Sequence, residues 1–132
     1  MGDSIFSKII KREIPAHIVH EDDDFMAFLD INPVQLGHTL VIPKKQIDYV
    51  FDIDDEDLSA MMIFAKKVAH GIKLATNCKR VGIAVLGFEV PHAHIHLVPL
   101  NQTSDMNFHN VQQVSNEQLM QIANEIKQHI NE

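Results

Sequence analysis

The stretch PHAHIHLVP, residues 91–99, is the most informative part of this chain. Successive side chains of a β-strand point to opposite faces of the sheet. A strand over 92–99 would therefore place His92, His94 and His96 on one face and the apolar residues between them on the other. We expect the apolar face to pack into the core and the imidazoles to line a surface or cleft.

Histidines on one strand face are compatible with two chemistries. A His-x-His pair on a strand is a good zinc chelate. The Cα atoms of His92 and His96 would lie about 13 Å apart at a rise of about 3.3 Å per residue, so a further ligand such as His38 would be needed. Alternatively, a neutral imidazole is a competent nucleophile toward phosphorus, and a protonated neighbour stabilises phosphoryl oxygens or a leaving group. The spacing alone does not decide between a metal site and covalent catalysis.

The composition is that of a single globular domain over residues 1–132. The chain has 18 acidic and 11 basic residues, a formal charge of −7, which argues against a non-specific nucleic-acid binder. A lone cysteine, Cys78, cannot form an internal disulfide. The sequence has no apolar run of about 18 residues to span a membrane and no secretory signal pattern at its start. We expect a cytoplasmic protein without a nucleic-acid or membrane partner.

Hydrophobic periodicity predicts helices and strands without regular βαβ alternation. Helical spacing occurs over 4–11, 55–76 and 119–130, the last after a capping box at Ser115 and Gln118. Strand patterns occur over 17–20, 25–29, 39–42, 81–86 and 92–99. Residues 81–86 are apolar on both faces, as is typical of a central strand. The fold class expected is α+β with a mostly antiparallel sheet.

Several blocks of the sequence match a known family, in the expected order. They are HAHIHLV at 92–98, IFSKII at 5–10 with EIPA at 13–16, AFLDINP at 27–33 and GHTLVIPK at 37–44. The chain resembles the histidine-triad (HIT) superfamily, and most closely its histidine-triad nucleotide-binding (Hint) branch. The resemblance implies a HIT-like antiparallel sheet with one long helix and additional N- and C-terminal helices. It also implies a homodimer joined across that long helix and a sheet edge.

The resemblance implies a purine-nucleotide-binding hydrolase or nucleotidyl transferase that uses no cofactor. His94 would attack the α-phosphorus, and water would release the nucleoside monophosphate, of AMP or GMP type, from a nucleotidyl-histidine intermediate. His96 and His38 match positions that surround the phosphate, and His92 matches a position that orients the nucleophile. This chemistry needs one free nitrogen on the nucleophile and donors aimed at the oxygens of the developing phosphorane.

The resemblance also suggests how a nucleoside would be held. Asp30 matches the position that accepts hydrogen bonds from the ribose hydroxyls. The apolar walls around the base match Ile5, Phe6, Ile9, Phe28 and Ile31. The same five residues have a simpler interpretation as ordinary core, and this alternative is strongest for Ile9.

The loop before the histidines departs from the family pattern. It reads GFEVP at 87–91, with Phe88 where relatives carry Gln and Glu89 where a Ser or Thr hydroxyl would reach the phosphate. We keep Glu89 among the nucleotide-binding residues, although a carboxylate repels a phosphate unless it is protonated, paired or turned away. One hypothesis is that Glu89 selects a substrate with a cationic leaving group. The missing Gln weighs against the branch that hydrolyses dinucleoside polyphosphates.

A second departure concerns metal. Some relatives hold a structural zinc with Cys and His ligands at three positions. The matching residues here are Ser4, Ser7 and Gln46, so all three zinc ligands are missing. We therefore expect no structural metal. The leading hypothesis is a hydrolase of nucleoside phosphoramidates or related nucleoside monophosphate derivatives. The alternatives are a non-catalytic nucleotide-binding or partner-binding protein, a dinucleoside polyphosphate hydrolase and, least favoured, a zinc enzyme that uses the same histidines.

Overall fold

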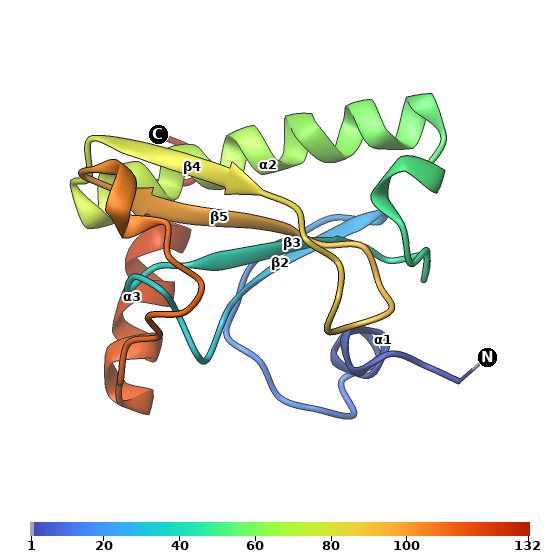
Figure 1. The fold of residues 1–132 in the computed structure, drawn as a ribbon, viewed down its shortest axis with the longest axis horizontal. Helices are drawn as coiled ribbons and strands as arrows, with labels where there is room; N and C mark the ends of the chain where they lie inside the picture. The colour runs from blue at the N-terminus through green and yellow to red at the C-terminus, as the bar shows by residue number, and fades with distance from the viewer. Residues whose placement is uncertain (1) are drawn as a thin grey trace.

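Five strands form one antiparallel sheet in the computed structural model, which describes residues 2–132 (Figure 1). The order across the sheet is β1, β2, β3, β5, β4, and every neighbouring pair is antiparallel. The strands are β1 (Ile18–Glu21), β2 (Phe25–Leu29), β3 (Thr39–Pro43), β4 (Arg80–Ala84) and β5 (Ile95–Leu100). With the helices around it, this sheet confirms the α+β class.

The helices begin where the sequence predicts them. Over the described residues they are α1 (Ile5–Ile10), α2 (Asp55–Thr76) and α3 (Asn116–His129), with short 3-10 turns η1 (Val50–Asp52) and η2 (Thr103–Asp105). The side chains of Ser4, Asp54 and Ser115 each accept a hydrogen bond from a backbone N–H in the first turn of their helix. Ser115 and Gln118 form the predicted capping box.

Side-chain alternation along the strands builds one apolar core on each face of the sheet. Ala27, Val41 and Ile95 pack with α2 and α3 on one face, where those two helices contact each other. Phe28 and Leu40 pack with α1 on the other face. In Figure 1, α1 lies beside the loop that joins β4 to β5. That loop and the α1 face of the sheet carry the histidines.

The expectation that residues 81–86 form a central strand is wrong. β4 lies at the edge of the sheet because β5 pairs with both β3 and β4 and takes the inner place. Ile83 and Val85 are consequently 49% and 41% exposed. An apolar pattern predicts a strand but not its place in the sheet, because the order of strands depends on pairing between segments that are distant in sequence.

The predicted strand over 92–99 begins later, at Ile95, so only His96 of the triad lies in a regular strand. The preceding backbone leaves the ladder, and the N–H of Ala93 donates to the carbonyl of Ile47 instead. The alternation of faces survives, because Ala93 and Ile95 are in the core while the imidazoles lie opposite. The histidines are also more buried than a surface position implies, with His92 at 0%, His94 at 6% and His96 at 8% exposed.

No helix among residues 2–132 is long and apolar enough to cross a bilayer.

Candidate active site

The backbone carbonyl of His92 sets the tautomer of His94. Nδ1 of His94 lies 2.8 Å from the carbonyl oxygen of His92. A carbonyl only accepts hydrogen bonds, so Nδ1 carries the proton and donates it. In a neutral ring, Nε2 of His94 then holds a free lone pair. His94 lines a cavity, which is the arrangement a nucleophilic imidazole needs.

His38 and His96 form a relay whose protons are also fixed from the backbone. The N–H of Val34 donates to Nδ1 of His38 at 3.1 Å, so the proton of His38 is on Nε2. That Nε2–H donates to Nδ1 of His96 across 2.9 Å. The remaining proton of His96 is therefore on Nε2. His96 lines the cavity, and its Nε2–H is a donor that the hydrogen bonds of this relay leave free.

Burial keeps both relay rings neutral. It lowers the pKa of His38 to about 4, with a smaller effect from the nearby His94. It also lowers the pKa of His96 to about 3, assisted by His38 and His94. Asp30 lies 3.8 Å from Nε2 of His38, and burial raises the pKa of this carboxyl. Near pH 7 the His38 ring in this contact is neutral, so the contact is not an ion pair.

His92 lies under helix α1 and lines neither this cavity nor the one next to it. Its Nε2–H donates to the carbonyl of Pro43 at 2.7 Å, and its Nδ1 accepts from the hydroxyl of Ser4 at 2.8 Å. Burial lowers its pKa, so this ring is neutral too. In this structure His92 contacts His94 through its backbone carbonyl, while its ring anchors that backbone.

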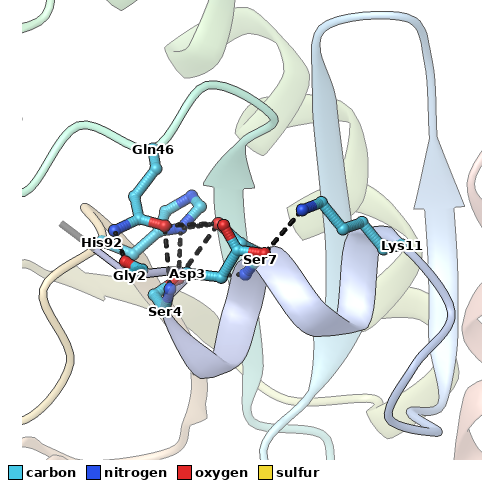
Figure 2. A network of polar contacts seen from close by, with 7 residues as sticks. All are labelled: Gly2, Asp3, Ser4, Ser7, Lys11, Gln46 and His92. Carbon is cyan, nitrogen blue, oxygen red and sulfur yellow. Dashed lines mark hydrogen bonds and ion pairs between the residues drawn. The ribbon is translucent and has the colours of Figure 1, made fainter.

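Ser4 belongs to a polar network at the start of α1, shown in Figure 2. Its backbone N–H donates to Oε1 of Gln46 at 2.8 Å, and the hydroxyl of Ser7 donates to the same oxygen at 2.7 Å. The N–H of Ser7 donates to Oγ of Ser4 at 2.9 Å. The three residues that stand at the zinc positions of some relatives thus hydrogen-bond one another and His92. The network ties α1 to the segment that carries His92 and His94.

The cavity beside His94 has a volume of about 240 Å³. Both Asp30 and Glu89 line it, and no Lys or Arg is among its lining residues within the described chain. Oδ1 of Asp30 accepts from the N–H of Asn32 at 2.8 Å, which leaves Oδ2 for a ligand. Gly87, with a φ of +80° that favours glycine, lines the cavity together with Glu89. The predicted residues His38, His94, His96, Asp30 and Glu89 are therefore together.

The residues predicted to wall the base do not line this cavity. Phe6, Ile9 and Phe28 are buried between α1 and the sheet, where Phe6 makes an edge-to-face contact with His94 at 5.1 Å between ring centroids. Ile5 and Ile31 are 50% and 65% exposed and so are accessible to a ligand.

Phe108 is a site residue that the sequence analysis missed. Its ring packs edge-to-face on His96 at a centroid distance of 4.9 Å and on His38 at 6.0 Å. The N–H of Gln112 donates to the carbonyl of Pro33 at 2.7 Å and holds this segment over the site. The surrounding sequence is polar and irregular, and the isolated Phe108 was the one signal in it. Its ring covers the relay and contributes to the burial that keeps His38 and His96 neutral.

Within residues 2–132, Asp30, His38 and His96 offer ligand atoms that lie within 4.8 Å of one another, as a metal ion would need. A cation there would compete with the 2.9 Å hydrogen bond between His38 and His96. It would also remove the proton arrangement that gives His96 its free donor. The geometry therefore fits phosphate chemistry by the rings better than metal ligation.

Comparison with known proteins gives the family. The family model of the HIT domain matches residues 11–103. An uncharacterized HIT-like protein of Methanocaldococcus jannaschii is 37% identical over 131 residues, which is 93% of this chain and 98% of that protein. The chain therefore belongs to the HIT domain family.

Two further relatives add detail. The adenosine 5'-monophosphoramidase of Saccharomyces cerevisiae is 44% identical over 96 residues, 72% of this chain and 61% of that protein. A crystal structure of a HIT-like protein from Bartonella henselae superposes with a TM-score of 0.83 at 32% identity and covers 96% of both chains. The match to the HIT domain model ends before Phe108 and α3, so the segment over the relay lies outside it.

Proposed function

We propose that this chain is a nucleotide-binding hydrolase that cleaves nucleoside phosphoramidates and related nucleoside monophosphate derivatives through a covalent nucleotidyl-His94 intermediate. The observation that carries the proposal is the 2.8 Å hydrogen bond from Nδ1 of His94 to the carbonyl of His92, which leaves Nε2 free at the cavity. The name of the yeast relative, an adenosine 5'-monophosphoramidase, supports the substrate class.

The tautomers support the following sequence of steps. Nε2 of His94 attacks the α-phosphorus, so a nitrogen–phosphorus bond forms and the bond from phosphorus to the leaving group breaks. An amine leaving group takes a proton from solvent water. Water then attacks phosphorus, the bond to His94 breaks, and the nucleoside monophosphate leaves while the protons of that water return to solvent. The resting tautomer of His94 is restored.

The neighbouring groups bind and stabilise. Nε2–H of His96 is placed to donate to a phosphoryl oxygen, and His38 keeps that ring from turning by donating to its other nitrogen. Oδ2 of Asp30 accepts from a ribose hydroxyl. We place the base against the exposed Ile5 and Ile31 beside the buried Phe6, Ile9 and Phe28. No cofactor takes part.

One observation favours a non-catalytic alternative, a protein that binds a nucleotide or a partner without turnover. Asp30 and Glu89 both line the cavity, and carboxylates weaken the binding of a phosphate. The two functions differ in one measurement, the release of AMP from adenosine 5'-phosphoramidate. Catalysis predicts release by the wild type and a loss of at least about 10⁴-fold in kcat for His94→Ala. AMP should still bind the variant in calorimetry, and His109→Ala, an exposed histidine, is the matched control.

We also propose a cytoplasmic homodimer that forms across α2 and the edge strand β4. The exposed apolar side chains of Met62, Ile63 and Ile83 lie on these two elements. An unpaired apolar edge strand is a surface that folded proteins normally cover. Light scattering should give a dimer mass for the wild type and a lower mass for Ile63→Asp with Ile83→Asp.

A further inference from the structure

A second cavity, of about 280 Å³, adjoins the first. Leu86, Gly87 and His94 line both cavities, so the nucleophile lies at their junction. Neither cavity alone reaches the roughly 300 Å³ that is the usual lower bound for small-molecule sites, but together they exceed it. The two cavities therefore have the size and continuity of two subsites of one substrate site.

The second cavity has an aromatic wall. Tyr49 and Phe51 line it and are 57% and 72% exposed, although both are large side chains. Their rings meet edge-to-face at a centroid distance of 5.5 Å. Val50 between them is 7% exposed and fixes η1 to the protein, so the two rings are held outward from a fixed turn. Val85 and Leu86 add aliphatic surface.

The polar groups of the two cavities differ in a way that assigns their contents. Asp30, His38 and His96, which suit a ribose and a phosphate, line only the first cavity. Among the described residues, the titratable groups that line the second cavity are Asp48, Tyr49 and His94. The aromatic and aliphatic side chains of the second cavity favour burial of an apolar substituent, and Asp30, His38 and His96 do not line it. The phosphate and ribose of the nucleotide therefore belong in the first cavity and the leaving group in the second.

We propose that the cavity walled by Tyr49 and Phe51 binds the leaving group and selects amines that carry an apolar or aromatic substituent. The proposal rests on the function proposed above and names the substrate class of that site. The bond from phosphorus to the amine nitrogen breaks as the bond from phosphorus to Nε2 of His94 forms. The amine takes a proton from solvent water and departs through the second cavity.

The test compares two adenosine 5'-phosphoramidates, one of benzylamine and one of methylamine. The ratio of their kcat/KM values should favour benzylamine by about tenfold or more in the wild type. The double variant Tyr49→Ala, Phe51→Ala should bring this ratio close to one, and both side chains are exposed, so their truncation leaves the core intact. Met120→Ala on α3 removes an equally exposed apolar side chain that lines neither cavity, and it should keep the wild-type ratio.

A binding measurement separates the leaving-group site from the reaction. Calorimetry with His94→Ala should give a lower Kd for the benzylamine compound than for the methylamine compound, and the added change of Tyr49 and Phe51 to Ala should remove the difference. Equal Kd values, or a kcat/KM ratio that the double variant keeps, would overturn the proposed leaving-group site. If the wild type turns over neither compound, the proposed hydrolase fails, and the Kd comparison still decides what the second cavity binds.

Discussion

The Nδ1–H of His94 donates to the backbone carbonyl of His92 across 2.8 Å, and the ring of His92 is itself held at both nitrogens. The position of His94, the proposed nucleophile, therefore depends on a residue whose ring does not reach the cavity. Ser4, at the start of α1, donates to that ring. The start of the short helix α1 thus helps to position His92 and His94, which are distant from it in the sequence.

Ser4→Ala tests this dependence. The change removes the helix cap that accepts from the N–H of Ser7 and the donor to Nδ1 of His92. We expect the free energy of unfolding to fall by about 1–3 kcal/mol. We also expect kcat to fall about tenfold with little change in KM, because the nucleophile is displaced while the substrate contacts remain. Chemical denaturation and steady-state kinetics measure the two effects.

Ser115→Ala is the matched control because it removes the cap of α3, and Ser115 lines neither cavity. It should lower stability without lowering kcat. Ser4→Thr keeps the hydroxyl and should restore most of kcat. If Ser4→Ala and Ser115→Ala reduce stability alike and neither changes kcat, the link from Ser4 to His94 is wrong.

The stability of the fold should depend on pH through the buried relay. Burial lowers the pKa of His38 to about 4 and that of His96 to about 3. The unfolded chain takes up protons on these rings below about pH 6.5, whereas the folded chain does so only near the lowered values. The free energy of unfolding is therefore highest at and above pH 7 and falls as the pH is lowered from 7 toward 4. Urea titrations across this range measure the slope.

His38→Gln should make that slope shallower, because one ring with a lowered pKa is gone. The exposed His109, changed to Gln, should leave the slope as in the wild type. An unaltered slope in His38→Gln would mean that His38 takes up its proton in the folded chain at its ordinary pKa.

Phe108→Ala should bring the pKa of His96 back toward its ordinary value. The ring of Phe108 packs on His96 at 4.9 Å, and its loss admits water to a group whose pKa is lowered chiefly by burial. Histidine resonances followed by NMR during an acid titration measure the shift. The control is His109→Ala, which removes a neighbouring exposed side chain and should leave the pKa of His96 unchanged. An unchanged pKa of His96 in Phe108→Ala would show that Phe108 does not contribute to burial of the relay.

Glu89→Ser tests the role of the carboxylate in the loop 87–91, which differs from the family pattern. Glu89 lines the first cavity together with His94, which lies at the junction with the second cavity, so its charge attracts a cationic leaving group across that junction and opposes a phosphate. We expect the variant to lose part of the preference for substrates with a cationic amine over those with a neutral leaving group. The measurement is the ratio of kcat/KM for two adenosine 5'-phosphoramidates, one whose amine leaving group carries a second, cationic ammonium group and one whose leaving group is uncharged. A ratio equal to that of the wild type would remove Glu89 from leaving-group selection.

Local signals predicted much of the fold. The capping box at Ser115 and the apolar periodicity of the three helices predicted these elements, because capping and amphipathic spacing involve residues that are close in sequence. The edge position of β4 escaped prediction, since the order of strands depends on the pairing of β5 with β3. The start of β5 escaped it as well, because the N–H of Ala93 finds its acceptor on Ile47, far away in the chain.

In the candidate site too, the features that depend on nearby residues were predicted and those that depend on distant residues were not. Alternation along 92–96 placed the imidazoles opposite the core, and the structure keeps that arrangement. The sequence could not reveal that the ring of His92 turns to Pro43 and Ser4 while that of His94 faces a cavity, because these partners come from distant segments. Phe108 was missed for a related reason, as it reaches the relay from a segment without periodicity.

The covalent role of His94 is the central claim, and intact-mass spectrometry after rapid quench tests it most directly. The wild type mixed with adenosine 5'-phosphoramidate and quenched in the first turnover should gain the mass of one adenylyl group. His94→Ala should show no gain, and peptide mapping of the wild type should place the group on His94. Release of AMP by the wild type without any adduct at the earliest quench times, or an adduct that persists in His94→Ala, would contradict the account.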